Sequence, residues 1–388
     1  MLIDFLIVVT FLVLFLFYYR CIILMRKYGE LKSPIKKDFS HEFSVSIVIP
    51  TYNEESIVAG RLDNLLELNY PFDLIEIIFV DSSTDKTPKI INDYQKLRTN
   101  IHLINEGERL GVATALNKAF AVAQNEIITR TDCDSFWHKD VLYHMMANFA
   151  DPTVGAVCGK QSVLNKSKVE EGYRSLQLRL QIVESWLDST IIFHGPCFGF
   201  RSNLLELIDP ESLADDTELA VKIRKQGYRT IIDPDIIFYE ASQSGFIKRR
   251  IQKDRRAKGL IRVLFQNKDV IFNRNYGKYG RYVFPMNYFM MIISPYLIAA
   301  LFLLSLYKIY LYSMKSMIVA CIITVVFMYL GQSDKLFVFE PIYSFIDTQV
   351  SLFLAGVSLI FGRKSKGIWQ KDEGLRNSYT ESIVKPKP

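Results

Sequence analysis

Residues 126–134 read Glu-Ile-Ile-Thr-Arg-Thr-Asp-Cys-Asp, an apolar stretch followed by two aspartates, Asp132 and Asp134, that stand one residue apart. The apolar part predicts a buried strand, and ligands of open α/β sheets bind beyond the carboxyl ends of such strands. Two carboxylates at that point are hard oxygen ligands that suit a divalent cation. A solvated turn is the alternative, because Asp-x-Asp occurs in many loops. The residues that follow the neighbouring strands indicate whether this is a metal site or a solvated turn.

Three further β-branched runs precede this one, at residues 45–49, 75–80 and 101–104. The stretches between them are long enough for crossover helices, which predicts a mostly parallel α/β sheet. Parallel strands are buried on both faces and should be continuously apolar, as residues 77–80 are.

Polar residues end two of these strands. The first strand runs into Pro50, Thr51, Tyr52 and Glu54, and the second into Asp81. Because the carboxyl ends of parallel strands share one edge, we expect these residues to bind a nucleotide, with Asp81 accepting hydrogen bonds from a base or ribose. Helix capping is the plainer alternative for each cluster.

No Gly-x-Gly-x-x-Gly or Walker sequence follows any of these strands, so the glycine-rich loops that commonly bind nucleotide phosphates are absent from the sequence. The negative charge of a bound phosphate must then be neutralised in another way. A metal and basic side chains are the remaining means. Arg109 stands just before a helix expected over residues 113–123, where it can reach a base or phosphate.

The two ends of the chain carry the excess of apolar residues. Of 388 residues, 49% are hydrophobic, and residues 2–19 contain Asp4 as their one charge, which predicts a membrane helix. A cleaved signal peptide is the alternative, but there the basic residues precede the apolar run, whereas here they come after it. Basic residues outnumber the single acid in residues 20–37, which places the α/β segment after them in the cytoplasm.

The formal charge of +6 is concentrated in residues 244–281, where twelve Lys and Arg face two aspartates. These cations are interleaved with large apolar residues, which is typical of a helix lying in the membrane interface. We therefore expect membrane lipids, and not nucleic acid, as the partner of this segment. The five cysteines have no paired spacing and are expected to be free thiols.

Residues 283–307, 317–330 and 341–362 are three further candidate membrane helices. Three crossings would leave the basic residues 363–366 outside the cell, against the usual bias. One span is therefore expected to be interfacial, re-entrant or miscounted, with the C-terminal tail in the cytoplasm. Asp347, in the last span, should face protein or water.

These patterns divide the chain into six parts. We expect a membrane helix, a basic linker, a cytoplasmic α/β domain, basic interfacial helices, a second membrane region and a tail, at residues 1–22, 23–43, 44–243, 244–281, 282–362 and 363–388.

Five motifs in this order resemble the inverting glycosyltransferases of family 2. They are Pro-Thr-Tyr-Asn-Glu (50–54), Val-Asp-Ser-Ser (80–83), Asp-Cys-Asp (132–134), Asp-Asp-Thr-Glu-Leu (215–219) and Gln-x-x-Arg-Arg (252–256). The chain is most similar to membrane-integrated synthases of the hyaluronan, chitin, poly-N-acetylglucosamine and cellulose type. The resemblance covers residues 44–275 and extends to Gly367-Ile368-Trp369 in the tail. It implies a GT-A type nucleotide-sugar-binding domain with a mostly parallel sheet, an interfacial helix and transmembrane helices at both ends.

The resemblance also implies roles for individual residues. Asp81 would contact uracil, Asp132 the ribose and diphosphate, and Asp134 a Mg²⁺ or Mn²⁺ ion between the phosphates, with Asp132 as a second metal ligand. Asp216 would be the general base that takes the proton of the acceptor hydroxyl. Asp215 and Asp216 also stand where a helix over residues 217–226 would be capped, before its Gly227 stop.

Gln252, Arg255 and Arg256 occupy the Gln-x-x-Arg-Trp motif that lies beside the donor diphosphate in the family, with Arg256 in place of the tryptophan. Arg255 can still pair with a phosphate in a bidentate manner. Without the aromatic residue, a transferase that makes one linkage competes with a processive synthase. Residues 194–200, His-Gly-Pro-Cys-Phe-Gly-Phe, stand where the synthases line the acceptor site, although a tight structural turn explains the glycines equally well.

The sequence therefore predicts a multi-pass enzyme of the cell membrane that transfers a sugar from a nucleotide sugar, UDP-linked, to a glycan. Transfer to a polyprenyl phosphate or another lipid-linked acceptor is the first alternative. A non-catalytic membrane protein that only senses a nucleotide sugar is the second.

Overall fold

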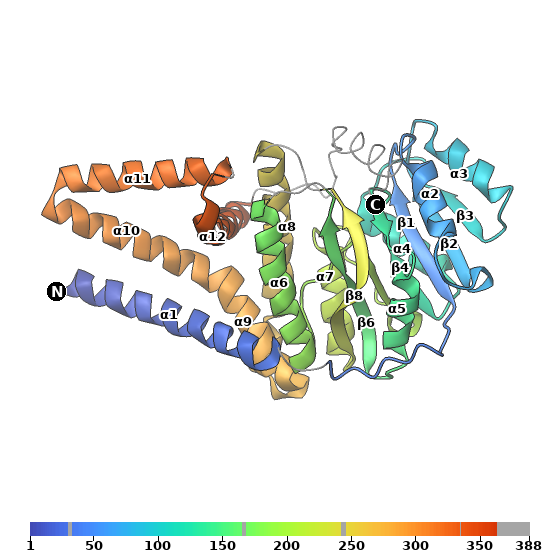
Figure 1. The fold of residues 1–388 in the computed structure, drawn as a ribbon, viewed down its shortest axis with the longest axis horizontal. Coiled ribbons are helices and arrows are strands. Elements are labelled where there is room, and N and C mark those ends of the chain that lie inside the picture. Colours follow the sequence, from blue (N-terminus) through green and yellow to red (C-terminus); the bar gives the residue numbers. More distant parts are fainter. Residues whose placement is uncertain (30–32, 165–167, 242–245, 334, 363–388) are drawn as a thin grey trace.

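The computed structural model describes residues 1–29, 33–164, 168–241, 246–333 and 335–362. It consists of an α/β body and a narrow stem of long helices on one side of it (Figure 1). The predicted tail motif at residues 367–369 lies outside the described residues, as do residues 242–245 at the boundary between the α/β domain and the basic segment.

The body is built on one eight-stranded sheet with the order β3-β2-β1-β4-β7-β6-β8-β5. The predicted strands are confirmed as β1 (Val45–Thr51), β2 (Ile75–Asp81), β3 (Ile101–Asn105) and β4 (Ile127–Arg130), and they are parallel to one another. The remaining strands are β5 (Ser135–Trp137), β6 (Val154–Val163), β7 (Phe198–Arg201) and β8 (Arg229–Glu240). Strand β7 lies antiparallel between β4 and β6, and β5 is antiparallel to β8, so the sheet is mixed but mostly parallel.

Helices cover both faces of this sheet. Side chains of β1 alternate between the two faces: Ile47 and Ile49 face one core and Val48 faces the other. The first core is closed by α2 (Val58–Leu66), α3 (Thr87–Gln95) and α5 (Val141–Phe149), and the second by α4 (Val112–Val122) and α7 (Asp215–Lys225). The predicted helices over residues 113–123 and 217–226 correspond to α4 and α7, and Gly227 ends α7 with a φ of +101°.

Two helices lie between the body and the stem. They are α6 (Lys168–Leu187) and α8 (Phe246–Gln266), and α8 is the predicted basic helix. A third core joins them to the body and the stem through residues such as Val221 of α7, Leu264 of α8 and Leu352. The buried Glu184 of α6 accepts a hydrogen bond from Asn287 Nδ2 at 2.6 Å, and burial raises the pKa of this carboxyl to about 7.

The stem contains α1 (Leu2–Gly29), α10 (Ser294–Tyr312) and α11 (Met314–Gln332), which extend side by side away from the body (Figure 1). A π-helical turn (Tyr279–Val283), α9 (Phe284–Tyr288) and a second π-helical turn (Phe289–Ile293) lead from the body into α10. Helix α1 is ten residues longer than the predicted span, and its extra turns carry Arg20, Arg26 and Lys27 towards the body.

The last apolar helix, α12 (Glu340–Ile360), is arranged differently. It is seen nearly end-on in Figure 1, across the direction of the stem, and packs on α8 and α6. The most apolar stretch of the helix ending in α12 is 44% buried, whereas the corresponding stretches are 6% buried in α1 and α11 and 17% buried in the helix ending in α10. All four helices are long and apolar enough to cross a membrane, and among them the one ending in α12 is the most covered by protein.

Candidate active site

A cavity of about 920 Å³ opens at the carboxyl ends of β1 and β4 and is bounded by α7, α8 and α12. Nearly all of the sequence-predicted site residues line it: Pro50, Thr51, Tyr52, Glu54, Arg109, Asp132, Asp134, Asp216, Gln252, Arg255 and Arg256. The two aspartates after β4 and the aspartate at the start of α7 therefore share one cavity, although more than 80 residues separate them in sequence.

Asp81 is the exception. Its side chain is fully buried and does not line the cavity. Thr51 Oγ1 donates a hydrogen bond to it at 2.7 Å, and the Ser83 backbone N–H donates another at 3.1 Å. In this structure the carboxylate fixes the ends of β1 and β2, and its contact with uracil stays a prediction. Thr51 and Ser82 form the cavity wall there instead.

Arg109 and Tyr52 make one wall of the cavity beyond β1. The Arg109 guanidinium carbon lies 3.9 Å from the centre of the Tyr52 ring, which is a close cation–π contact. A flat aromatic ring and a flat guanidinium in contact form a surface suited to a nucleotide base.

Arg130, which sequence reasoning missed, links the two acidic parts of the site. It ends β4, its side chain is almost fully buried, and its Nη2 donates to Asp132 Oδ1 at 3.1 Å while its Nη1 donates to Asp215. Burial opposes the charge on Arg130, but Asp215 and Asp132 outweigh it and raise the pKa of Arg130 above its usual value. The sequence contained a signal for this role: Arg130 ends an apolar run that predicts a buried strand, and a buried cation needs an anionic partner.

Asp216 lies beside this pair at the start of α7. Its Oδ1 accepts a hydrogen bond from the Thr217 backbone N–H at 2.6 Å. Burial, followed by the nearby Asp215, raises the pKa of Asp216 to about 6, although Arg130 and Arg256 act in the opposite direction. A carboxyl with this pKa is mostly ionised at neutral pH and is a competent proton acceptor. The expected cap is not formed, because Asp215 and Asp216 are the first residues of α7 and the capping position is taken by Ala214, without a side-chain hydrogen bond. Both acids nevertheless lie at the positive end of the helix dipole.

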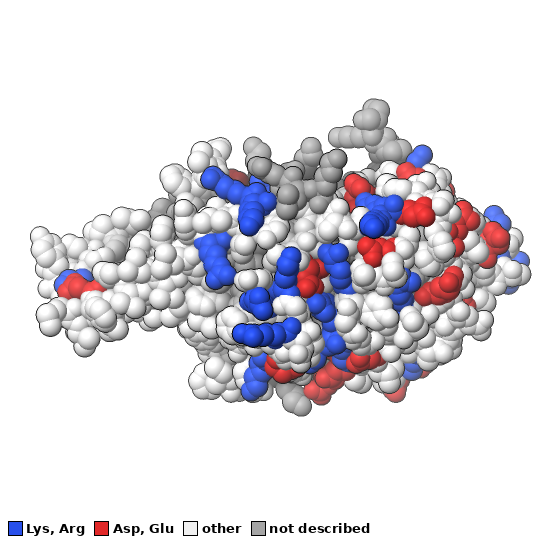
Figure 2. Space-filling view, turned by 90° about the horizontal axis from the view of Figure 1, so that it is seen from below, with Lys and Arg blue, Asp and Glu red and all other residues white. Residues whose placement is uncertain are grey.

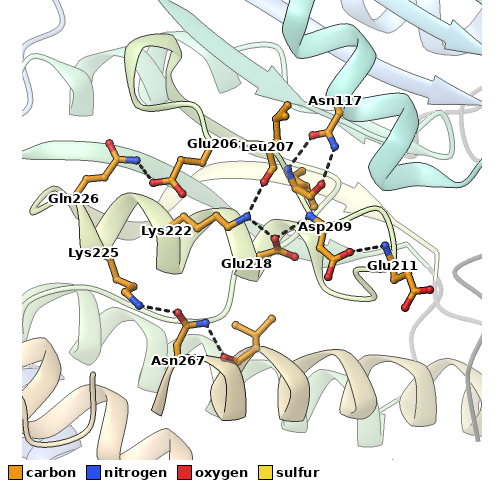
Figure 3. Close-up of polar contacts among 12 residues, drawn as sticks. Asn117, Glu206, Leu207, Asp209, Glu211, Glu218, Lys222, Lys225, Gln226 and Asn267 are labelled. Carbon is orange, nitrogen blue, oxygen red and sulfur yellow. Dashed lines mark hydrogen bonds and ion pairs between the residues drawn. The ribbon is translucent and has the colours of Figure 1, made fainter. Parts of the chain in front are cut away.

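The other end of α7 is held by polar contacts with the loop that precedes it (Figure 3). Lys222 Nζ donates to the Leu207 carbonyl at 2.6 Å and to Glu218 at 2.7 Å, and Glu218 also accepts from the Asp209 backbone N–H. Lys225 donates to Asn267 at the end of α8. These contacts fix the position of α7, and so of Asp215 and Asp216.

Arg255 and Arg256 of α8 line the same cavity as these acids. Burial, together with the positive charge of Arg256, lowers the pKa of Arg255 to about 10, and Asp215 and Asp132 oppose this change. Arg255 therefore stays charged at neutral pH. The loop before β7 also reaches the cavity with His194, Gly195 and Pro196, and Gly195 lies against the Arg130 guanidinium, which a Cβ there would approach to 2.9 Å.

Residues 46–208 match the model of the family described as Glycosyl transferase family 2. This segment is a family 2 glycosyltransferase domain. It contains β1 to β7 and both Asp132 and Asp134, whereas α7 and α8 lie beyond the matched residues.

Curated relatives share this domain. The chain is 26% identical over 250 residues to the beta-monoglucosyldiacylglycerol synthase of Nostoc sp., covering 60% of this chain and 52% of the relative. It is 31% identical over 136 residues to the poly-beta-1,6-N-acetyl-D-glucosamine synthase of Staphylococcus epidermidis, covering 35% and 32%. The chain thus spans about half the length, or less, of these curated relatives.

A solved structure resembles the whole chain. A mannosyltransferase from Pyrobaculum calidifontis, in complex with GDP-Man and Mn²⁺, aligns with a TM-score of 0.75 at 24% identity, covering 92% of this chain and 99% of that one. At this identity the likeness shows the fold, which is a GT-A-like glycosyltransferase fold.

The glycosyltransferase domain can supply two carboxylates to a metal. Among the described residues no group of three His, Cys, Asp or Glu side chains could hold an ion alone. Mg²⁺ and Mn²⁺ at such sites are held by one or two carboxylates together with phosphate oxygens and water, so Asp132 and Asp134 fit an ion that arrives with a diphosphate. Asp132 Oδ1 already accepts from Arg130, which leaves its second oxygen for the ion.

Gly259 provides a test of how closely α8 must approach this site. A Cβ at residue 259 would lie 2.8 Å from the carbonyl carbon of Leu213 and 2.9 Å from its oxygen, just before Asp215. We expect Gly259→Ala to move α8 from α7 and lower the sugar-transfer rate roughly tenfold to a hundredfold, since small displacements at reacting groups cost that much. The matched control is Gly60→Ala in α2, where a Cβ meets nothing within 4 Å. Equal transfer rates for both variants and the wild type would contradict the importance of this contact.

Proposed function

We propose that the chain is a metal-dependent, inverting glycosyltransferase that moves a sugar from a nucleoside diphosphate sugar to a lipid acceptor at the membrane interface. The continuity of the cavity supports this most strongly. It runs from Asp132 and Asp134 past Asp216 to Tyr343 and Leu352 of α12, beside the stem. One end suits a charged donor, and the other lies among membrane-associated helices.

In this proposal the donor occupies the end of the cavity nearest β1. Tyr52 and Arg109 hold the base, with Pro50, Thr51 and Glu54 around the nucleoside. Gln252, Arg255 and Arg256 face the diphosphate. Mg²⁺ or Mn²⁺ at Asp134 and Asp132 would offset the negative charge of the departing nucleoside diphosphate. We expect UDP from the sequence motifs, and the GDP-Man in the Pyrobaculum mannosyltransferase makes GDP the second nucleotide to test.

Asp216 is proposed as the general base. It lines the cavity from α7, and Asp132 and Asp134 line it from the loop after β4. Asp216 takes the proton of the acceptor O–H as the acceptor oxygen bonds to the anomeric carbon. The bond from that carbon to the diphosphate oxygen breaks on the opposite side, and the configuration is inverted. Arg130 keeps Asp215 paired, so that Asp216 and not Asp215 is available to the proton.

The stem favours a lipid acceptor over an exported polymer. Only 6% to 17% of the apolar stretches of α1, α10 and α11 is buried, which suits helices surrounded by lipid better than helices packed around a channel for a polymer. The helix most covered by protein, α12, instead lines the cavity. The relative named as a glucosyldiacylglycerol synthase fits this reading better than the relative named as a polysaccharide synthase.

The same arrangement implies a topology. We infer that α1, α10 and α11 cross the membrane and that α12 lies in the interface, which resolves the odd number of C-terminal crossings expected from sequence. Lys and Arg gather where the stem joins the body, and the face of the stem shown carries charge only near its tip (Figure 2). Asp4 and Lys308 form an ion pair of 2.7 Å within the stem. The gathering of Lys and Arg where the stem joins the body supports a cytoplasmic body.

Replacing the proposed base gives the first test of this function. We expect Asp216→Asn to lower transfer by about a hundredfold to ten-thousandfold, while binding of the nucleotide with Mn²⁺ stays unchanged. The wild-type rate should fall as the pH drops through about 6, because the pKa of Asp216 is raised to that value and the protonated form cannot accept a proton. The exposed Asp73→Asn is the control. An Asp216→Asn variant with normal turnover would exclude this base.

The product provides the second test. The purified chain in lipid vesicles, given Mn²⁺ and radiolabelled UDP-glucose, UDP-N-acetylglucosamine or GDP-mannose, should place label in material that organic solvent extracts. Label found only in a water-soluble polymer would contradict the lipid acceptor.

Topology gives the third test. A reporter fused after Pro388 should be active in the cytoplasm, and one inserted at Ser313, between α10 and α11, should lie outside. A reporter after Pro388 that lies outside the cell would show that α12 crosses the membrane.

A further inference from the structure

Asp347 of α12 is the most enclosed charge at the membrane end of the cavity. It is 4% exposed, and it accepts hydrogen bonds from Arg250 Nη1 at 2.9 Å and from Lys253 Nζ at 2.6 Å. All three side chains line the same cavity as Asp216. A single buried carboxylate thus engages two cations of α8 that would otherwise be directed at the acceptor.

Arg250 and Lys253 together are what a phosphate-binding site needs, because an arginine fork and a lysine ammonium pair well with phosphate oxygens. Asp347 occupies the place that such a phosphate would take. Charged side chains among membrane helices are costly and mark functional positions. The ion pairs of Asp347 with Arg250 and Lys253 therefore affect which acceptor the site can bind.

The charge of the whole cavity also favours an acceptor without a phosphate group. Among the described residues that line it, nine are Lys or Arg and eight are Asp or Glu. A nucleoside diphosphate sugar and one divalent cation bring roughly compensating charges, so they leave this near-balance unchanged. An acceptor phosphate would add one or two negative charges to this cavity, which Asp215, Asp216 and Asp347 already line.

We propose that the acceptor is an uncharged lipid alcohol and that Asp347 determines this specificity by holding Arg250 and Lys253. The inference rests on the proposed function, whose acceptor class it narrows. In the step itself the lipid O–H oxygen bonds to the anomeric carbon, its proton passes to Asp216, and the nucleoside diphosphate leaves with the electron pair of the broken bond. A hydroxyl needs the base that the site offers, whereas an ionised phosphate does not.

The test compares two acceptors in the same phosphatidylcholine vesicles, dioleoylglycerol and a polyprenyl monophosphate. The full-length protein receives Mn²⁺ and each of the three radiolabelled nucleotide sugars, and the products are separated by thin-layer chromatography. For the wild type we expect transfer to dioleoylglycerol to exceed transfer to the polyprenyl phosphate at least tenfold. A wild-type preference for the polyprenyl phosphate would overturn the inference but leave the lipid-acceptor function intact, whereas label in polymer alone would overturn both.

Asp347→Asn should then shift the ratio of the two products about tenfold or more towards the phosphate acceptor, because Arg250 and Lys253 lose their anionic partner. A loss of packing alone would lower both products together, so the ratio distinguishes specificity from structure. Adding Lys253→Gln to Asp347→Asn should restore the preference for the alcohol. Asp254→Asn, on the same helix but paired with Lys258 and outside this cavity, is the matched control and should leave the ratio unchanged. An unchanged ratio in Asp347→Asn would contradict the role of Asp347.

Discussion

The structure depends on one buried ion-pair network, in which Arg130 holds Asp132 on one side and Asp215 on the other. Arg130 is the last residue of β4 and Asp215 the first of α7, so this guanidinium joins the end of a parallel strand to a helix that is remote in sequence. Taking a buried charge from its partners costs about 3–5 kcal/mol, which makes the distance between these two segments a stiff constraint. A metal-binding loop and a proton acceptor on opposite sides of a substrate need such a fixed spacing.

A second group of ion pairs lies at the other end of the cavity, between α12 and α8. Asp347 joins α12 to α8 through Arg250 and Lys253, and the same helix carries Gln252 and Arg256 into the cavity. The position of α8 is thus set from two directions, by α12 on the membrane side and by the close approach of Gly259 to Leu213 on the body side. The packing of the apolar helix α12 and the shape of the site therefore depend on each other.

Sequence reasoning found the local features and missed the ones that depend on partners. The four parallel strands, helix α7 and the gathering of Asp132, Asp134 and Asp216 could be predicted from apolar runs that end in polar residues. The antiparallel β7 could not, because a four-residue strand has no periodicity of its own.

Individual residues whose role depends on a distant partner were harder to predict. Arg130 lies in the motif over residues 126–134, but nothing in the sequence indicated that its partner is Asp215. The burial of Asp81 could not be foreseen, because a strand-end aspartate that faces a cavity and one that braces two strand ends have the same sequence pattern. The sequence left open which of the last three apolar helices does not cross the membrane, because hydropathy does not tell whether lipid or protein covers a helix.

The central claim is that one substrate lies between the loop after β4 and the start of α7. A structure of the full chain with Mn²⁺ and a non-hydrolysable nucleotide sugar tests it most directly. The account predicts that the ion contacts the diphosphate and the Asp134 carboxylate, with the anomeric carbon between the ion and Asp216. An ion or nucleotide bound elsewhere, or a sugar directed away from Asp216, would contradict it.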